Sequence, residues 1–219
     1  MRGFVAGATG KTGRLIVQQL IDQGISVTAL VRDLEKAKAV LPETTKLIVG
    51  DVLQASSFNF ALADCSFLIC ATGASPSLNP SGPYKIDYQG TRTLVDSAKN
   101  QGIKHFVLVS SLCVSKFFHP LNLFWLVLYW KKQAEKYIQT SGIEYTIVRP
   151  GGLKDENNSD SIIMSKADTL FEGSISRLKV AQVCVAALSQ SQAKSKIVEI
   201  VADSGAASKA WSQLFANVA

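Results

Sequence analysis

Short apolar runs alternate with longer amphipathic stretches along the chain. The apolar runs are continuous in Val, Ile and Leu, without polar alternation, which is typical of strands covered on both faces. We expect strands at Gly3–Ala6, Ser26–Val31, Lys46–Val49, Phe67–Ala71, His105–Val109, Tyr145–Arg149 and Ile197–Val201. The stretches between them have helical periodicity, at Gly13–Gln23, Asp33–Leu41, Pro83–Gln101, Leu126–Ser141 and Leu178–Ser189. This alternation predicts an α/β fold: a doubly wound, parallel sheet of about seven strands with helices on both faces.

Glycines and polar segments mark the ends of these elements. Gly24, Gly102 and Gly142 each follow a helical stretch, as expected for the residue just past a helix end. No internal repeat or low-complexity linker divides the 219 residues, so we expect a single domain over 1–219, with its regular half at about 1–110. Residues 154–161 are polar and predict a surface excursion, and the residues from Ser204 predict a packing helix.

A glycine-rich turn, Gly7-Ala8-Thr9-Gly10-Lys11-Thr12-Gly13, joins the first strand to the first helix. Its first glycine permits the reversal, its second lets the backbone approach a pyrophosphate, and its third lets the helix pack closely. The helix N-terminus adds free N–H groups and a partial positive charge. Because a strand precedes the turn and a helix follows, we expect a dinucleotide site on a Rossmann domain, rather than a structural turn alone. Contacts are expected from Gly7, Thr9, Gly10, Lys11, Thr12 and Gly13.

The end of the second strand indicates which dinucleotide is bound. NAD enzymes place an acid here for the ribose 2′-hydroxyl, whereas this chain has Arg32, whose fork suits a 2′-phosphate. Asp33 is interpreted as the N-cap of the next helix, and Lys11 as a second cationic contact. The alternative is that Arg32 merely covers the sheet end. We therefore expect NADP (NADPH) as the cofactor.

Later strand ends supply the remaining cofactor contacts. Ligands of doubly wound sheets bind at the carboxyl ends of the strands. Asp51 and Val52 follow the third strand and could meet the adenine amino group and ring face. Small residues follow the fourth strand and allow close approach of the nicotinamide ribose, and the glycines after the sixth strand could pass under the nicotinamide. Besides Asp51 and Val52, the expected contacts are Ala71, Thr72, Gly73, Ser110, Pro150 and Gly151.

These motifs, together with others, resemble those of the atypical and extended short-chain dehydrogenase/reductases, to about residue 200. The additional motifs are Asp87-Tyr88-x-Gly90-Thr91, Val107-x-Val109-Ser110-Ser111 and Val148-Arg149-Pro150-Gly151. Two branches are most similar. One is the dehydrogenase-like NADP-binding subunit of the chloroplast inner-envelope translocon with its cyanobacterial relatives, and the other is the biliverdin-IXβ/flavin reductases. The resemblance implies NADPH-dependent reduction of a planar acceptor such as a flavin or a bilin.

The chain departs from the family at its proton donor. Ordinary members use Ser and Tyr-x-x-x-Lys, and here Lys131 best matches the lysine, yet Val127 stands at the tyrosine position. Tyr129 is two residues out of place. The catalytic candidates are Ser111, for the nicotinamide amide or the acceptor, and Lys131, for the nicotinamide ribose. The alternatives are a turn-capping hydroxyl for Ser111 and a solvent-facing helix residue for Lys131.

Composition and charge narrow the class of protein. The net charge of +6 and pI of about 9.1 come from dispersed lysines and arginines, which is weak support for nucleic-acid binding, and we expect none. Four separated cysteines without a C-x-x-C motif and only two histidines predict buried free thiols and no metal site. With no signal-like leader and no apolar run of bilayer length, we expect a cytoplasmic protein, which could also lie peripherally at a membrane.

The most apolar segment, Phe117–Trp130, lies between the serine strand and the lysine helix. It contains more aromatic rings than one helix face can bury. Three interpretations stay open: plain core, a stacking platform for the acceptor, or a contact with a membrane or a partner.

The expected function is an NADPH-dependent reductase of a flavin, bilin or similar conjugated acceptor, without the usual tyrosine. The alternative is an NADP-binding, redox-sensing module that docks on a membrane or a protein complex. An epimerase or dehydratase of nucleotide sugars is disfavoured, because such reactions depend on the missing tyrosine. The oligomeric state stays open.

Overall fold

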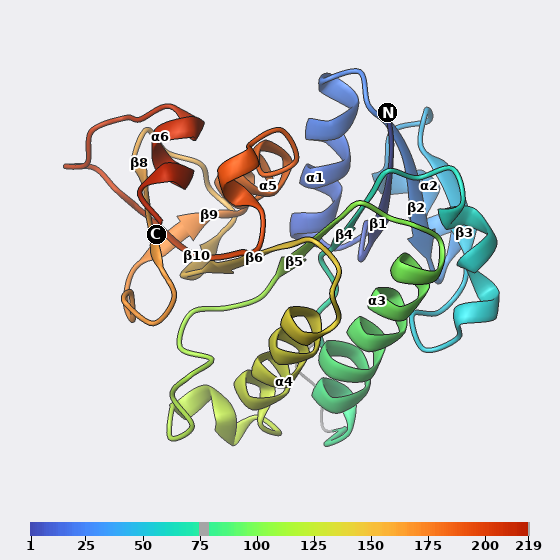
Figure 1. The fold of residues 1–219 in the computed structure, drawn as a ribbon, viewed down its shortest axis with the longest axis horizontal. Helices are drawn as coiled ribbons and strands as arrows, with labels where there is room; N and C mark the ends of the chain where they lie inside the picture. The colour runs from blue at the N-terminus through green and yellow to red at the C-terminus, as the bar shows by residue number, and fades with distance from the viewer. Residues whose placement is uncertain (75–78, 219) are drawn as a thin grey trace.

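The computed structural model describes residues 1–74 and 79–218 (Figure 1). An eight-stranded sheet runs in the order β3-β2-β1-β4-β5-β6-β10-β8. Its strands are β1 (Arg2–Ala6), β2 (Ser26–Val31), β3 (Lys46–Val49), β4 (Phe67–Cys70), β5 (His105–Val109), β6 (Tyr145–Pro150), β8 (Ser161–Lys166) and β10 (Lys196–Asp203). Parallel pairing joins all of them except β8, which is antiparallel to β10. The predicted doubly wound α/β fold is confirmed.

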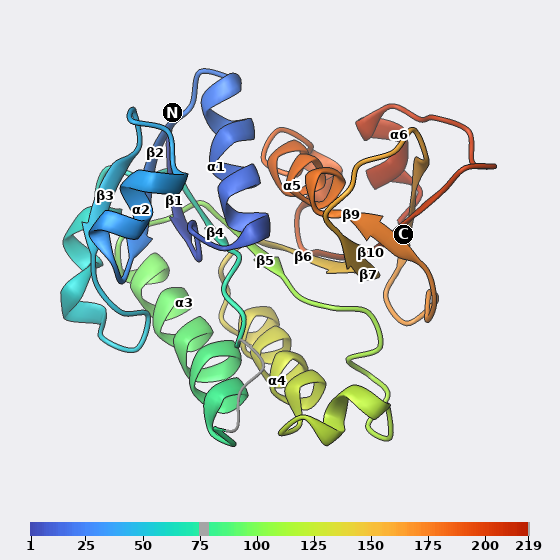
Figure 2. The same cartoon turned by 180° about the vertical axis from the view of Figure 1, so that it is seen from behind.

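Helices cover both faces of the sheet (Figures 1 and 2). The elements outside the main sheet are α1 (Lys11–Asp22), α2 (Leu34–Val40), α3 (Thr91–Asn100), α4 (Val127–Thr140), α5 (Arg177–Ala186), α6 (Trp211–Ala216), the small strands β7 (Gly152–Lys154) and β9 (Ser174–Ser176), and the short helices η1 (Ala55–Ser57), η2 (Asn59–Leu62), η3 (Tyr84–Gly90), η4 (Pro120–Leu123) and η5 (Ser191–Ala193).

Alternate residues of each strand pack into two separate hydrophobic cores, one on each face of the sheet. On β1, Val5 packs with residues of α1, α2 and α5, whereas Phe4 and Ala6 pack with residues of α3 and α4. Side chains of a strand point to opposite faces in turn, so each apolar run fills both layers. This explains why the strands lack polar alternation.

Local stop signals act as the sequence predicts. Gly24, Gly102 and Gly142 have φ angles of +73°, +71° and +80°, which favour glycine at the helix end. Asp33 caps α2, and its side chain accepts a hydrogen bond from the Lys36 backbone N–H at 3.0 Å. The C-terminal helix is also confirmed, because Leu214 and Phe215 of α6 are buried.

Besides the small strands β7 and β9 and the short 3-10 helices, two elements differ from the sequence prediction. Strand β8 follows the polar excursion directly and adds an eighth strand at the sheet edge, where Met164 is the only buried residue of the strand. A half-covered edge strand has a weaker apolar pattern than a central one, so it escaped detection. The helix expected at Pro83–Gln101 begins as the π-helix η3 and continues as α3. Such π-turns are frequent at functional sites.

None of the helices in the described ranges is long and apolar enough to cross a membrane.

Candidate functional site

A cleft of about 500 Å³ opens at the carboxyl ends of β1, β2, β3 and β4. It contains nine of the residues expected to contact the cofactor: Gly7, Thr9, Gly10, Arg32, Asp51, Val52, Ala71, Thr72 and Gly73. Segments far apart in sequence meet here because parallel strands end at the same edge of the sheet. The structure therefore brings nine of the fifteen expected contact residues together; the other six, Lys11, Thr12, Gly13, Ser110, Pro150 and Gly151, are not part of the cleft lining.

The glycine turn has the geometry that close approach to a diphosphate requires. Gly7 has φ +79°, and a Cβ there would lie 2.6 Å from the Ala71 backbone. A Cβ on Gly13 would lie 2.1 Å from the Gly7 carbonyl oxygen, so this glycine lets α1 pack against the turn. Gly10 is the N-cap of α1 and makes no side-chain cap, which leaves the helix N-terminus available to an anion. The turn thus fits the diphosphate of a dinucleotide.

Two cations line the cleft. Arg32 directly follows β2, and Lys36 lies in the first turn of α2, whose start is held by the Asp33 cap. Lys36 was not among the expected cofactor contacts; its place in the first turn of the helix that follows Arg32 is the local signal that could have indicated it.

Lys11 lies elsewhere. It is not among the residues that line the cleft, and its Nζ lies 2.5 Å from Asp155 Oδ2. Asp155 also accepts a hydrogen bond from Arg177 Nη1 at 2.6 Å. Both cations lower the pKa of the Asp155 carboxyl, with the Lys11 hydrogen bond as the largest cause. The expected cationic contact from Lys11 stays a prediction.

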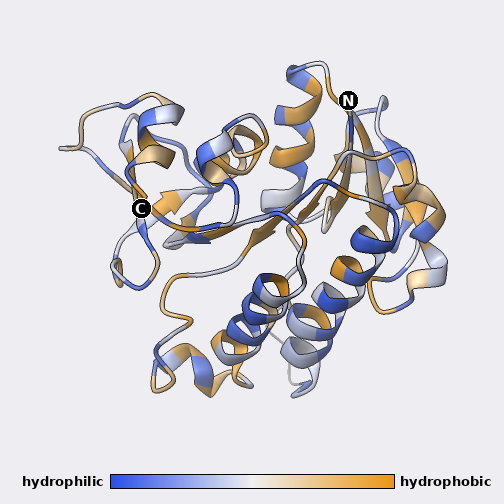
Figure 3. Ribbon diagram, viewed as in Figure 1, coloured by the Kyte–Doolittle hydropathy of each residue, from blue (hydrophilic) through white to orange (hydrophobic). Residues whose placement is uncertain are grey.

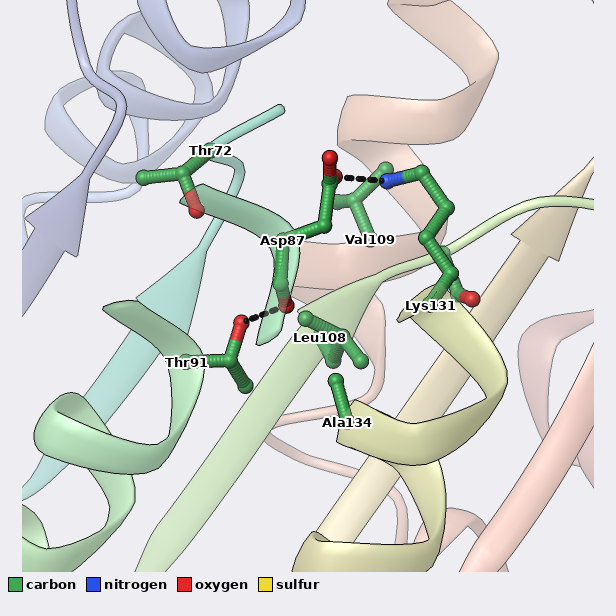
Figure 4. Close-up of a pocket in the computed structure, with 8 residues that line it drawn as sticks. Thr72, Asp87, Thr91, Leu108, Val109, Lys131 and Ala134 are labelled. Carbon is green, nitrogen blue, oxygen red and sulfur yellow. Dashed lines mark hydrogen bonds and ion pairs between the residues drawn. The ribbon is translucent and has the colours of Figure 1, made fainter. Parts of the chain in front are cut away.

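A second pocket, too small to hold a water molecule, adjoins the cleft through Thr72 and contains Lys131 and Asp87 (Figure 4). The two side chains point toward one another from α4 and η3, with Lys131 Nζ 2.8 Å from Asp87 Oδ1. Their side chains are 17% and 1% exposed. Lys131 is therefore not the solvent-facing helix residue of the alternative interpretation. Asp87 also accepts a hydrogen bond from Thr91 Oγ1 at its backbone carbonyl, at 2.8 Å.

The charge state of Lys131 follows from this pairing. Burial lowers the pKa of the Lys131 ammonium, but the charge and hydrogen bond of Asp87 outweigh burial and leave that pKa above its usual range. Lys131 is thus a cationic hydrogen-bond donor at neutral pH.

The two serines after β5 have different surroundings. Ser110 lines the small pocket, and its Oγ donates to Glu135 Oε1 at 2.6 Å. Ser111 is half-exposed and is not among the pocket's lining residues. Its catalytic assignment stays a prediction.

A buried charge cluster that the sequence analysis missed supports these residues. Arg149 is fully buried, and its Nε and Nη2 donate to the two carboxylate oxygens of Glu135 at 3.0 and 2.7 Å. Its Nη1 donates to Glu199 at 3.1 Å and to Asp168 at 2.8 Å. Burial lowers the pKa of the Arg149 guanidinium, yet Glu135 and then Glu199 outweigh it and raise that pKa. The cluster anchors α4 one turn beyond Lys131.

Pro150 and Gly151 shape the backbone beside the pocket rather than line either cavity. The Pro150 carbonyl accepts a hydrogen bond from the Leu112 N–H at 3.0 Å. A Cβ on Gly151 would lie 2.6 Å from the Gly173 carbonyl oxygen, so glycine permits two segments to touch. Thr12 likewise lies outside the cleft lining.

The aromatic segment divides into a packed part and an exposed part. Tyr129 and Trp130 meet edge to face at 5.0 Å between ring centroids, and Trp130 also meets Tyr84 at 4.8 Å. In contrast, Phe118 is 96% exposed and Leu123 is 84% exposed. Plain core is therefore the wrong interpretation for the first part of the segment.

The sequence matches a family model described as NAD(P)H-binding over residues 7–191. It is 46% identical to an uncharacterized chloroplastic protein of Arabidopsis thaliana, over 98% of this chain and 81% of that protein. It is 39% identical to Protein TIC 62, chloroplastic, of Pisum sativum, over 93% of this chain and only 43% of that protein. Sanguinarine reductase of Eschscholzia californica is 29% identical, over 98% and 95% of the two chains.

The fold also matches ChuY, named as an anaerobillin reductase from Escherichia coli O157:H7. The TM-score is 0.79 at 23% identity, over 96% of this chain and all of that one. The structural match shows the shared fold, and together with the sequence matches it confirms the family resemblance.

The expected cytoplasmic location is wrong. The relatives at 46% and 39% identity are both named as chloroplastic proteins, and this points to a plastid instead.

A glycine turn, paired cations and a lysine–aspartate pair thus lie along one edge of a doubly wound sheet, and the family model covers most of the chain. The chain belongs to the NAD(P)H-binding family of Rossmann-fold proteins, and a reductase is among its relatives.

Proposed function

We propose that the chain is an NADPH-dependent reductase that transfers a hydride to a planar conjugated acceptor, a flavin or a bilin, without a tyrosine proton donor. The observation that carries the proposal is the continuity of the site. The cleft with Arg32 and Lys36 meets the pocket with Lys131 and Asp87 at Thr72, which lines both. This continuity along one sheet edge supports the binding of one extended dinucleotide.

The residues of the cleft bind and orient. Arg32 and Lys36 would hold a 2′-phosphate, and Asp51 and Val52 would flank the adenine. The helix N-terminus after Gly10 would hold the diphosphate. When NADPH is bound, it supplies the hydride.

Lys131 and Asp87 act at the other end of the site. Lys131 Nζ donates hydrogen bonds, and we assign it to the nicotinamide ribose. Asp87 keeps Lys131 protonated and fixes its direction, so Asp87 is a positioning residue. Ser110 is held by Glu135, which leaves Ser111 as the serine free to face the nicotinamide amide or the acceptor.

The missing tyrosine limits the acceptors. Val127 occupies its position, and the Tyr129 ring packs against Trp130 and Phe117. A conjugated acceptor such as a flavin or bilin spreads the added charge and can take its proton from solvent, so positioning alone supplies much of the rate. A simple carbonyl substrate would need the absent acid.

The activity test is oxidation of NADPH by the full chain with FMN, FAD or biliverdin as acceptor, followed by the loss of nicotinamide absorbance. We expect turnover with at least one of these acceptors and little with NADH. NADPH that binds but is never oxidised by any of them would refute the reductase proposal.

The cofactor preference is tested by binding titrations. Arg32→Ala or Lys36→Ala should each weaken NADPH binding by about 1.5–3 kcal/mol, the contribution of a charged hydrogen bond, and leave NADH binding nearly unchanged. Lys38→Ala is the matched control, because Lys38 lies on the same helix, pairs with Glu35 at 2.8 Å and is absent from the cleft lining. Equal losses for both cofactors would contradict the 2′-phosphate assignment.

A second candidate function is an NADP-binding, redox-sensing module that docks on a membrane or a protein complex. The exposed apolar segment before α4 favours it. It differs from the reductase in a measurable way: association would change with the redox state of the bound cofactor, with no turnover of acceptor.

A further inference from the structure

The segment 117–126, here called the apical segment, projects from the N-terminal end of α4, away from the sheet (Figures 1 and 3). Seven of its ten residues are apolar and exposed, namely Phe117 at 53%, Phe118 at 96%, Leu121 at 44%, Leu123 at 84%, Phe124 at 63%, Trp125 at 43% and Leu126 at 37%. Scattered apolar residues on a surface need no explanation, but a contiguous group usually marks an interaction site.

The apical segment is held in this exposed form by specific contacts. Asn122 is buried, and its Oδ1 accepts hydrogen bonds from the Leu128 and Tyr129 N–H groups at 2.9 and 3.2 Å. Its Nδ2 donates to the Phe117 carbonyl at 2.8 Å. The segment is therefore tied at both ends to the start of α4.

The backbone of the apical segment is also strained. Trp125 and Leu126 have φ angles of +58° and +57°, a left-handed conformation that disfavours bulky side chains. Strain of this kind persists where the surrounding structure imposes it, and it often accompanies function.

The charge beside the apical segment suits an anionic surface. The whole chain has a net charge of +6. Lys116, directly before the segment, is exposed, and its Nζ lies 3.6 Å from the Phe171 ring centroid. Lysines beside exposed Phe, Trp and Leu are typical of segments that lie in a membrane interface.

We propose that the apical segment inserts into the headgroup region of a membrane rich in anionic lipids and docks the protein there. A bilayer interface accepts a projecting group of rings and leucines, whereas a protein partner would need a matching hollow for Phe118 and Leu123. Because α4 begins at Val127 and carries Lys131 one turn later, docking places the membrane on the acceptor side of the site. The proposal does not depend on the reductase activity.

The experiment is flotation of the full chain with phosphatidylcholine vesicles, with or without phosphatidylglycerol. We expect the protein to float with the anionic vesicles, and added salt to weaken binding because surface charges are screened. The triple variant Phe118→Ser/Leu123→Ser/Phe124→Ser should lose at least about tenfold in partitioning, since each removes apolar area from the interface. Lys116→Gln should lose about fivefold, the contribution of one lysine near such a surface.

Two controls keep the result specific. Phe60→Ser removes a ring that is 67% exposed on η2, remote from the apical segment in sequence, and should bind vesicles like the wild type. Unchanged circular dichroism and NADPH binding of the triple variant show that its loss is not unfolding. The emission of Trp125 should shift to the blue on vesicle binding, and Trp125→Phe should abolish that shift.

Three outcomes would overturn the proposal. The wild type could remain unbound with both kinds of vesicle. The triple variant and Phe60→Ser could bind equally well. Alternatively, sedimentation could show a wild-type dimer that the triple variant converts to a monomer, in which case a second copy of the chain covers the segment. Acceptor turnover is measured separately, so its failure is distinguishable from any of these.

Discussion

Replacement of Arg149 by methionine tests whether the buried charge cluster supports the site. Arg149, Glu135 and Glu199 are all fully buried, and their side chains come from β6, α4 and β10. Arg149→Met keeps much of the side-chain volume but removes the only guanidinium in the cluster. Glu135 then retains the Ser110 hydroxyl at 2.6 Å and Lys132 at 3.9 Å. Glu199 retains three backbone N–H donors, from residues 168–170.

The expected cost follows from the uncompensated charge. Removing one partner of a buried ion pair destabilises a protein by about 3–5 kcal/mol, and a whole domain is stable by only about 5–15 kcal/mol. Glu135 loses both of its bidentate bonds, so most of the cost should lie there. The double variant Arg149→Met/Glu135→Gln should therefore recover about 1–3 kcal/mol relative to Arg149→Met. Asp168→Asn should cost below about 1 kcal/mol, because the Asp168 side chain is 44% exposed.

The assay is urea unfolding followed by circular dichroism and tryptophan fluorescence. A loss below about 0.5 kcal/mol, or no recovery in the double variant, would refute this account.

Two further predictions concern titratable groups. Asp87→Asn removes the largest of the causes that raise the Lys131 pKa and leaves burial, which lowers it. Lys131 should then lose its proton at a lower pH, so NADPH binding should weaken at a lower pH than in the wild type. Fluorescence titrations of NADPH binding across alkaline pH measure this shift. Identical pH profiles for the variant and the wild type would contradict the role assigned to Asp87. All four cysteines are buried, burial raises their pKa values, and that of Cys184 reaches about 12. They should resist a thiol reagent in the native state and react only after unfolding; rapid labelling of the native protein would contradict this.

Much of the cofactor cleft was predictable from the sequence, because its parts are local. The Gly7–Gly13 turn, Arg32 at the end of β2 and the Asp33 cap each depend on neighbouring residues and on which strand they follow. The parallel sheet then brings strand ends together by rule. Lys36 was missed although it is equally local, since the family pattern drew attention to the strand end alone.

The chemistry beside the cleft was much less predictable. Lys131 was identified by its spacing, but its partner Asp87 lies on another element, and nothing in either local sequence indicates the pair. Lys11 and Asp155 are 144 residues apart in the chain, so only the folded structure shows that they meet. Arg149 belongs to the motif Val148-Arg149-Pro150-Gly151, from which the sequence predicts backbone contacts with the cofactor. The motif does not indicate that the Arg149 side chain forms buried ion pairs with Glu135 and Glu199.

The sequence by itself determined the alternation of strands and helices, the helix ends and the class of ligand, because hydrophobic periodicity, glycine conformation and strand-end chemistry act over a few residues. Only the tertiary structure decided which charges are paired and which apolar residues are exposed. The apical segment shows why: its pattern suits a buried core, a ring-lined pocket or a membrane contact equally well. The difference arises from whether distant segments cover it, and Asn122 and the left-handed turn at Trp125 and Leu126 hold it out of the core.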